Sequence, residues 1–407
     1  MYANRMNNDM AVSPIVATLV LIVVAVIGAV AVGTIMGTFS SDVSKQASAA
    51  DAATGSGQQI LIAGSTTCIP AELNLQTDYQ RVNPGTQINV QGGGSSEGPE
   101  AVALGIADIG AVSSSSTITN AIADNPTNPI YQNLYFTQIG GRGVVFIQDA
   151  SLTAVPTNIV DQADLNTAYD SAAANSGKTS AAITGTVSVY VNGQTETVGG
   201  IAAKTTMEQR EAGSGTMSTA FNWIGGDAKN NASNGFTGLP SNNGNAAMLT
   251  AVQAGSSSSP IIGFVDSGYA ITGGVSSNTT ASGISIMGVA AKNATGIYAA
   301  YLPTHANIKA ALKDWYYGNA QDTSTGTGII NGQGIAGQNY PQALVGGLYW
   351  ITKGSVGSAF NGNQIGTVGI SAASSPVTAL ISFAKSPSEA QAFNNAGVYS
   401  MYDFMQS

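Results

Sequence analysis

The sequence predicts an α/β protein whose globular part follows a long hydrophobic N-terminal helix. Two observations lead to this prediction. An uncharged apolar run near the N-terminus has the length of a membrane or filament helix, and beyond residue 60 short apolar runs alternate with helical patterns. That alternation of strands and helices is typical of a parallel sheet covered by helices.

The hydrophobic helix is predicted over residues 12–39, and its most apolar part is residues 15–39. As a helix this part would extend roughly 38 Å at about 1.5 Å per residue, which exceeds the ~30 Å hydrocarbon core of a bilayer. Arg5 lies before it, so the positive-inside rule places the rest of the chain outside the cell. Its small residues would let helices pack closely, either in a membrane or in a filament.

Residues 10–15 (MAVSPI), together with the helix that follows, resemble the N-terminus of archaeal type IV pilins. The resemblance implies a leader, residues 1–11, that is cleaved between Ala11 and Val12. The family usually has a basic residue where this chain has Met10. The resemblance also implies that residues 12–39 hold the protein at the outer face of the cell membrane, or assemble it as a homopolymer into an extracellular filament.

The remaining elements are predicted from composition and periodicity. Residues 40–59 are rich in Ser, Ala and Gln and are expected to be a linker. Asn192-Gly193, between alternating runs, predicts a hairpin over residues 186–198. Ser-Pro pairs near the C-terminus predict helix starts at Pro376 and Pro387. Strands are expected at residues 59–63, 87–91, 107–112, 143–147, 261–265 and 283–289, and helices at 72–80 and 99–104.

The composition excludes several classes of function. Only 9% of the residues are charged and the formal net charge is -9, which argues against nucleic-acid binding because phosphates require a basic surface. One Cys and one His exclude an internal disulfide and a multi-histidine metal site. We expect Cys68 to be a buried small residue at a helix start and His305 to lie in a surface loop. No nucleophile and base are paired, so neither enzymatic activity nor a cofactor is expected.

Three loops share one pattern, in which glycines precede hydroxyl residues and a predicted helix start. They are residues 64–67 (GSTT), 92–96 (GGGSS) and 213–216 (GSGT). Glycines let backbone N–H groups approach an anion, and a helix N-terminus adds unpaired donors. A single loop of this kind is more often an ordinary helix cap, but the occurrence of three favours a binding role.

Arg210 lies shortly before the third of these loops, in a chain that has few cations. A guanidinium there suggests recognition of a tetrahedral oxyanion, because its planar fork of donors matches such a group. The alternative is a surface ion pair with Glu208 or Glu211. The position of Arg210 beside a glycine–hydroxyl loop favours the oxyanion interpretation over the ion pair, which would otherwise be the default.

Four segments in this order resemble the phosphate-binding proteins of phosphate ABC importers: residues 63–67 (AGSTT), 92–98 (GGGSSEG), 107–111 (ADIGA) and 210–216 (REAGSGT). Residues 245–253 and 262–265 resemble a later segment of that family. The resemblance implies a two-lobed periplasmic-binding-protein fold of type II that closes on its ligand like a hinge. Lobe 1 would combine residues 60–139 and 273–407, and lobe 2 would be residues 140–272. An ABC importer permease would be the partner.

The phosphate ligands implied by the resemblance are Thr66, Thr67, Ser95, Asp108, Arg210, Ser214, Gly215 and Thr216. Thr67, Gly215 and Thr216 would act through backbone N–H groups. Asp108 would select the ligand, because a carboxylate beside an anion is repulsive unless the anion donates a proton. Phosphate carries such a proton near neutral pH and sulfate does not. The alternative for Asp108 is a strand-end carboxylate that faces solvent.

We therefore expect a cell-surface solute-binding protein that captures inorganic phosphate and is anchored or assembled through its N-terminal helix. The alternative is a structural pilin-like subunit of an archaeal filament whose globular domain has this fold. Asn231, Asn278 and Asn293 stand in glycosylation sequons, which suit an exported protein.

Overall fold

The computed structural model describes residues 58–132, 134–185, 187–191, 194–277, 279–292, 298–318, 340–353 and 376–405. The predicted leader, the helix over residues 12–39 and most of the linker lie outside these ranges, as do Asn278 and Asn293. Contacts divide the chain into Met1–Gln59 and Ile60–Ser407. No helix within the described ranges is both long and apolar enough to cross a bilayer.

A mixed sheet, in the order β2-β1-β3-β17-β4-β11-β8, forms the centre of the larger unit. The α/β class is confirmed, and the expected parallel pairing is found between β1 and β3. The sheet as a whole is mixed, because β17 runs antiparallel to both β3 and β4. The strands are β1 (Gln58–Gly64), β2 (Thr86–Gly92), β3 (Ile109–Val112), β4 (Leu134–Asp149), β8 (Thr206–Met207), β11 (Ile261–Asp266) and β17 (Val345–Lys353).

Strand β4 runs through two parts of this sheet. Its residues 134–143 pair with β17, and its residues 144–149 pair with β11 and β14 (Ile284–Ile286). The strand expected at residues 143–147 is thus the C-terminal part of a much longer one. We call β2, β1, β3, β17 and the start of β4 the first half of the sheet, and the end of β4 with β11, β14 and β8 the second half.

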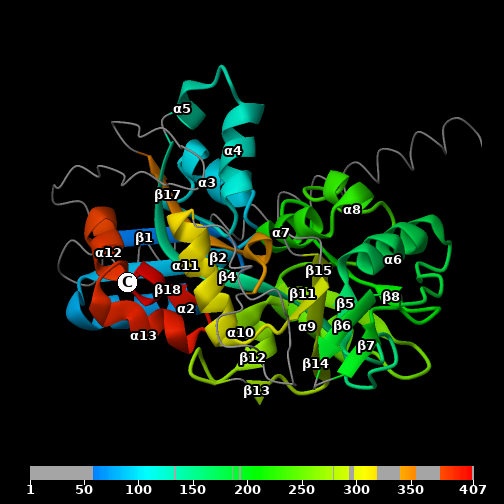
Figure 1. The fold of residues 1–407 in the computed structure, drawn as a ribbon. Helices are drawn as coiled ribbons and strands as arrows, with labels where there is room; N and C mark the ends of the chain where they lie inside the picture. Colours follow the sequence, from blue (N-terminus) through cyan, green and yellow to red (C-terminus); the bar gives the residue numbers. More distant parts are fainter. Residues whose placement is uncertain are drawn as a thin grey trace, which may run out of the picture. The chain divides into compact units, whose positions relative to one another are not determined.

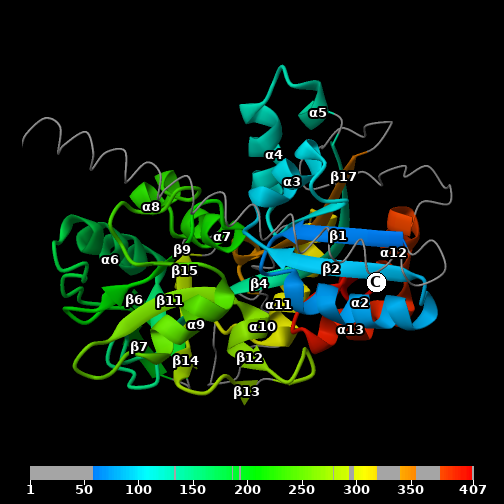
Figure 2. The ribbon, with the colours of Figure 1, turned by 180° about the vertical axis from the view of Figure 1, so that it is seen from behind.

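Helices cover both faces of the first half. Leu348 and Trp350 of β17 pack with one group of helices, while the alternate residues Tyr349 and Ile351 pack with another. Figures 1 and 2 show α3 and α4 on the opposite side of β1 from α2 and α13. The helices of the first group are α2 (Ile69–Val82), α12 (Pro376–Ala384) and α13 (Ala390–Asn395), and those of the second are α3 (Glu97–Leu104) and α4 (Ser115–Asp124).

The second half packs against helices through an aromatic core. Phe221 contacts Phe264 of β11 at a ring-centroid distance of 5.5 Å, and Phe264 lies 6.1 Å from Phe146 of β4. The predicted hairpin is confirmed in its two strands, β6 (Val187–Val191) and β7 (Gln194–Val198). The helices are α6 (Gln162–Ala174), α7 (Gly215–Ile224), α8 (Gly226–Asn230) and α9 (Asn245–Gln253).

Smaller elements complete the described part of the chain. The strand expected at residues 283–289 is divided between β14 and the start of β15. Both helix starts predicted from Ser-Pro pairs are present, one as α12 and the other as a 3-10 turn leading into α13. These elements are α5 (Pro129–Gln132), β5 (Ile159–Asp161), β9 (Gln209–Arg210), β10 (Ser241–Asn242), α10 (Ser267–Ala270), β12 (Ile271–Thr272), β13 (Thr279–Thr280), β15 (Gly288–Lys292), β16 (Tyr298–Tyr301), α11 (His305–Tyr317), η1 (Gln342–Leu344), η2 (Pro387–Glu389), β18 (Tyr399–Ser400) and α14 (Met401–Met405).

The structure confirms the prediction for Cys68 and contradicts the one for His305. Cys68 is buried directly before α2, as predicted, and burial raises the pKa of its thiol. His305 is not in a surface loop, because it is the buried first residue of α11 and its Nδ1 lies 2.6 Å from the hydroxyl of Tyr399. Burial lowers the pKa of His305 to about 4, so the ring is neutral at neutral pH.

Candidate functional site

The first two hydroxyl loops lie side by side at the ends of strands in the first half. Gly64 ends β1, and its carbonyl accepts hydrogen bonds from the N–H groups of Gly93 and Gly94 at 2.9 and 3.0 Å. Ser113 directly follows β3, and its Oγ lies 3.0 Å from Oγ of Ser95. The ends of β1 and β3 thus gather hydroxyl groups from three segments of the chain.

The third loop forms the N-terminus of α7. Ser214 caps this helix, since its Oγ accepts from the N–H of Met217 at 3.3 Å. The next two N–H groups, of Gly215 and Thr216, belong to the first turn, where a helix has no internal acceptors and its dipole favours an anion.

Glycine is required where the third loop meets the first half of the sheet. A Cβ added to Gly215 would lie 2.6 Å from Oγ of Ser113 and 2.9 Å from Oγ of Ser95. Gly213 has a φ of +77° and lies against the side chain of Ser96. The three loops therefore meet at one place. We call Thr66, Thr67, Ser95, Ser113, Arg210, Ser214, Gly215 and Thr216 the loop cluster.

Arg210 lies in β9 and its side chain is buried. Its Nε and Nη2 each donate to one carboxylate oxygen of Glu211 at 2.8 Å, so the ion pair foreseen as an alternative does form. The pair is not on the surface, however, since the Arg210 side chain is 1% exposed and that of Glu211 is 16% exposed. Nη2 of Arg210 also donates to Oγ1 of Thr66 at 3.1 Å, and Nη1 donates to Oδ1 of Asn245 at 2.6 Å. Arg210 thereby joins the third loop to the first.

Asp266, the last residue of β11, is the buried carboxylate of the site. Its Oδ2 accepts hydrogen bonds from the hydroxyls of Thr67 and Thr216, both at 2.6 Å, and from Nδ2 of Asn245 at 2.8 Å. These bonds use the threonine hydroxyls. The backbone N–H of Thr67 donates to Oγ of Ser65 at 3.3 Å, whereas that of Thr216 lies in the first turn of α7.

Arg142 is the second buried cation, and it lies in β4 where pairing changes from β17 to β11. Its Nη1 donates to Oδ1 of Asp266 at 3.0 Å. Its Nε donates to the carbonyl of Ser113 at 2.7 Å, and Nη2 donates to the carbonyl of Gly215 at 3.1 Å. One side chain thus links both halves of the sheet to the start of α7. Each of the two buried arginines is thus paired with one carboxylate.

Seven of the eight predicted ligands belong to the loop cluster, and Asp108 does not. Asp108 is exposed and precedes β3, where its carboxylate accepts the N–H of Leu61 at 2.9 Å. Ser113 follows the same strand, so at about 3.3 Å per residue the two ends of β3 are roughly 16 Å apart. The structure therefore places Asp108 as the alternative described it, as a strand-end carboxylate.

Four residues of the site were not predicted: Ser113, Arg142, Asn245 and Asp266. Two of them carried a signal in the sequence. Arg142 stands between glycines next to an apolar run, and Asp266 follows the apolar run of β11 directly. A lone cation and a carboxylate at the edges of buried strands indicate a buried ion pair, because isolated buried charges are costly.

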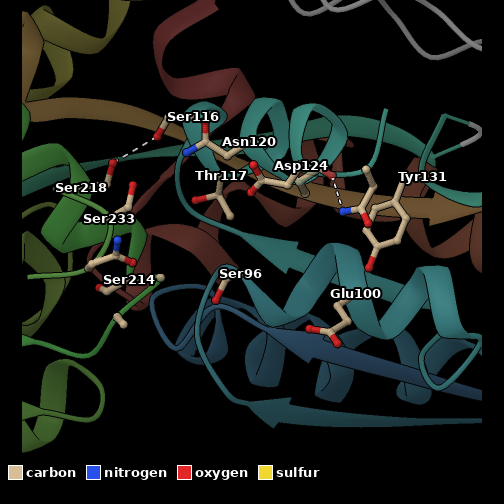
Figure 3. A pocket seen from close by; sticks show the side chains of 15 residues that line it. Ser96, Glu100, Ser116, Thr117, Asn120, Asp124, Tyr131, Ser214, Ser218 and Ser233 are labelled. Carbon is tan, nitrogen blue, oxygen red and sulfur yellow. Dashed lines mark hydrogen bonds between the residues drawn. The ribbon is translucent and has the colours of Figure 1, made fainter. Parts of the chain in front are cut away.

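A cavity of about 410 Å³ borders the loop cluster. Ser96, Gly213 and Ser214 line it on the side of the cluster, and the hydroxyls of Ser116 and Ser218 meet at 3.1 Å across it. Figure 3 shows Glu100 and Tyr131 at the far side from Ser214. The described residues that line it carry mostly hydroxyl and amide groups, together with the carboxylates of Glu100 and Asp124, and none of them is Lys or Arg.

Comparisons with known proteins give a fold likeness at low identity. No family model and no curated protein matches the chain. A solved structure from Clostridium perfringens, described as a phosphate ABC transporter substrate-binding protein with bound phosphate, is similar at 14% identity and a TM-score of 0.49, covering 84% of this chain and all of that one. An ABC-type phosphate transport receptor from Vibrio cholerae gives 16% and 0.46, with coverage of 84% and 99%. PstS from Borrelia burgdorferi gives 16% and 0.39, with coverage of 84% and 98%. These values leave the ligand of this chain to be argued from the site itself.

Proposed function

We propose that this chain is a solute-binding protein that holds a tetrahedral oxyanion of the phosphate type at the loop cluster. One observation carries the proposal. Three glycine–hydroxyl loops, far apart in the sequence, meet at the N-terminus of α7 beside a buried arginine. A single loop of this kind is usually a helix cap, whereas three that meet supply many donors around one point.

Binding would depend on dipoles and hydrogen bonds rather than on excess positive charge. The N–H groups of Gly215 and Thr216 would donate to the anion, together with the hydroxyls of Ser95 and Ser214. Oγ1 of Thr66 accepts from Arg210, so its own hydrogen is available to the ligand. Because both arginines already have carboxylate partners, the helix dipole and these donors would compensate the charge of the anion.

Closure of two lobes is part of this proposal. Lobe 1 would be residues 60–139 and 273–407, and lobe 2 would be residues 140–272. The division is supported by β4, whose pairing changes after Gly143, close to the proposed boundary. Donors on α7 and on the loops of the first half would surround the ligand only when the lobes are closed, so ligand binding would favour closure. The cavity beside the cluster would admit the ligand.

The cellular setting is proposed from the sequence alone. The apolar run over residues 15–39 would hold the protein at the outer face of the membrane, where it would deliver its ligand to an ABC permease. The same run favours a second candidate, a pilin-like subunit that assembles through residues 12–39. Electron microscopy of cells that express the chain distinguishes them, since filaments absent from cells and from purified protein would exclude the second.

Equilibrium dialysis of the full-length protein with radiolabelled phosphate tests the proposed ligand. We expect saturable binding at one site per chain. Arg210→Ala should weaken it by at least about 10-fold, because it removes the charged donors that hold Thr66 and Asn245 in place. Asp108→Asn is the matched control and should bind as the wild type does, because the amide oxygen still accepts from Leu61. Absence of phosphate binding by the wild type would refute the proposal.

A further inference from the structure

Selection of phosphate over sulfate requires a group that accepts a proton from the ligand. Hydrogen phosphate is both donor and acceptor, whereas sulfate near neutral pH only accepts. A buried carboxylate that pairs with the phosphate proton would be left facing a bare oxygen of sulfate. Sites that depend on one such hydrogen bond reject the analogue lacking it by about 10⁴-fold. The carboxylates around the loop cluster therefore decide the selectivity.

Asp266 is already engaged by four donors and is closed off from the cavity beside the cluster. Its Oδ2 accepts from Thr67, Thr216 and Asn245, and its Oδ1 accepts from Arg142. An oxygen of a carboxylate offers about two lone-pair positions, so Oδ2 is fully used, and Oδ1 keeps one position beside the Arg142 guanidinium. Asp266 is 0% exposed and is not among the described residues that line the cavity, so it presents no acceptor to a ligand there.

The other carboxylates near the cluster are also engaged or exposed. Both oxygens of Glu211 bond to Arg210, and its Oε2 accepts in addition from the N–H of Gly244 at 3.1 Å. Glu97 is exposed and lies against Gly93, where water competes for its bonds. Asp108 lies at the other end of β3.

We infer that the loop cluster binds tetrahedral oxyanions as a class and does not discriminate phosphate from sulfate. This inference rests on the proposed function and concerns the same site. The groups left to the ligand are N–H donors and serine or threonine hydroxyls. A hydroxyl donates to sulfate and can turn to accept from hydrogen phosphate, so neither anion leaves a buried group unpaired.

The inference is tested by equilibrium dialysis of the full-length wild-type protein. Radiolabelled phosphate and radiolabelled sulfate are compared in parallel at pH 7 and equal ionic strength. We expect the two dissociation constants to agree within about 10-fold, with each anion displacing the other. Phosphate binding with sulfate weaker by about 10³-fold or more would overturn the inference and leave the proposed function standing. Binding of neither anion would overturn both.

A gain of selectivity supplies a second arm. Ser113→Asp places a new carboxylate beside Ser95 and the start of α7, with no buried donor assigned to it. In this variant the ratio of the sulfate dissociation constant to the phosphate dissociation constant should rise by at least about 10-fold, whatever the change in absolute affinity. Ser113→Asn has nearly the same size without the charge and should leave that ratio as it is in the wild type. If circular dichroism shows either variant to be unfolded, the wild-type dialysis with phosphate and sulfate still tests the inference by itself.

Discussion

Glu72 on α2 provides the sharpest test of the packing of the first half. The side chain is 1% exposed, and its Oε1 accepts the indole N–H of Trp350 at 2.7 Å. Its Oε2 is buried and makes no hydrogen bond in the described part of the chain. Burial raises the pKa of Glu72 from 4.5 to about 8, so the folded protein holds a neutral carboxylic acid there.

The direction of the pH effect follows from this raised pKa. Below pH 4.5 the acid is protonated in both states, and its contribution to stability is fully present. Between pH 4.5 and about 8 the unfolded chain ionises while the folded one does not, so the free energy of unfolding falls as pH rises. At 1.36 kcal/mol per pKa unit, the loss reaches about 3 kcal/mol by pH 7.

Glu72→Gln should remove this loss, because the amide oxygen still accepts from Trp350 and no charge can form. Urea unfolding followed by tryptophan fluorescence at pH 5 and pH 8 measures the difference. We expect the advantage of Gln over Glu to grow by about 3 kcal/mol between the two pH values. Glu100→Gln, on the exposed side of α3, should change stability by less than about 0.5 kcal/mol at both. An advantage that does not depend on pH would refute the neutral buried acid.

Two further substitutions test the site. Arg142→Met should lower the free energy of unfolding by about 3 to 5 kcal/mol, because it leaves Asp266 buried without its cation. Urea unfolding measures the loss, and Arg81→Met, at an exposed arginine, is the control. A similar loss of stability in the control would contradict the role assigned to Arg142. Gly215→Ala should weaken phosphate binding by at least about 10-fold, because its methyl group enters the contact with Ser95 and Ser113. In the same dialysis Gly85→Ala should leave the affinity for phosphate unchanged, since a methyl group there meets nothing within 4 Å. Equal phosphate affinities of the Gly215 and Gly85 variants would argue against binding at α7.

Local patterns predicted most elements of the α/β part, but not the directions of the strands. The apolar runs of β1, β2 and β3 and the helical pattern of α2 are contiguous in the sequence, so they could be recognised. The antiparallel neighbours of β4 depend on pairings between segments far apart in the chain, which no local pattern records. The length of β4 was missed because residues 140–143 (GGRG) interrupt its apolar pattern.

The site shows the same division between local and distant information. The three loops could be recognised because glycine and hydroxyl residues before a helix have a meaning of their own. Asp108 could have been set aside by topology alone. Asp108 precedes β3, whereas residues 64–67 lie at the C-terminal end of β1. Because β1 and β3 are parallel, the N-terminal end of one and the C-terminal end of the other lie at opposite edges of the sheet. Asp266 and Arg142 meet only through pairing between β4 and β11, which are far apart in the sequence.

The position of β17 has a consequence for synthesis of the chain. This strand lies between β3 and β4, yet it is among the last to leave the ribosome. Until Val345–Lys353 has been made, β3 has an open edge, whereas the strands of the second half are already complete. Unpaired strand edges can pair with other chains. The edge of β3 stays unpaired for a long part of synthesis, because β17 lies far along the chain. Truncation before β17 should therefore yield a product that aggregates through its first half while its second half folds.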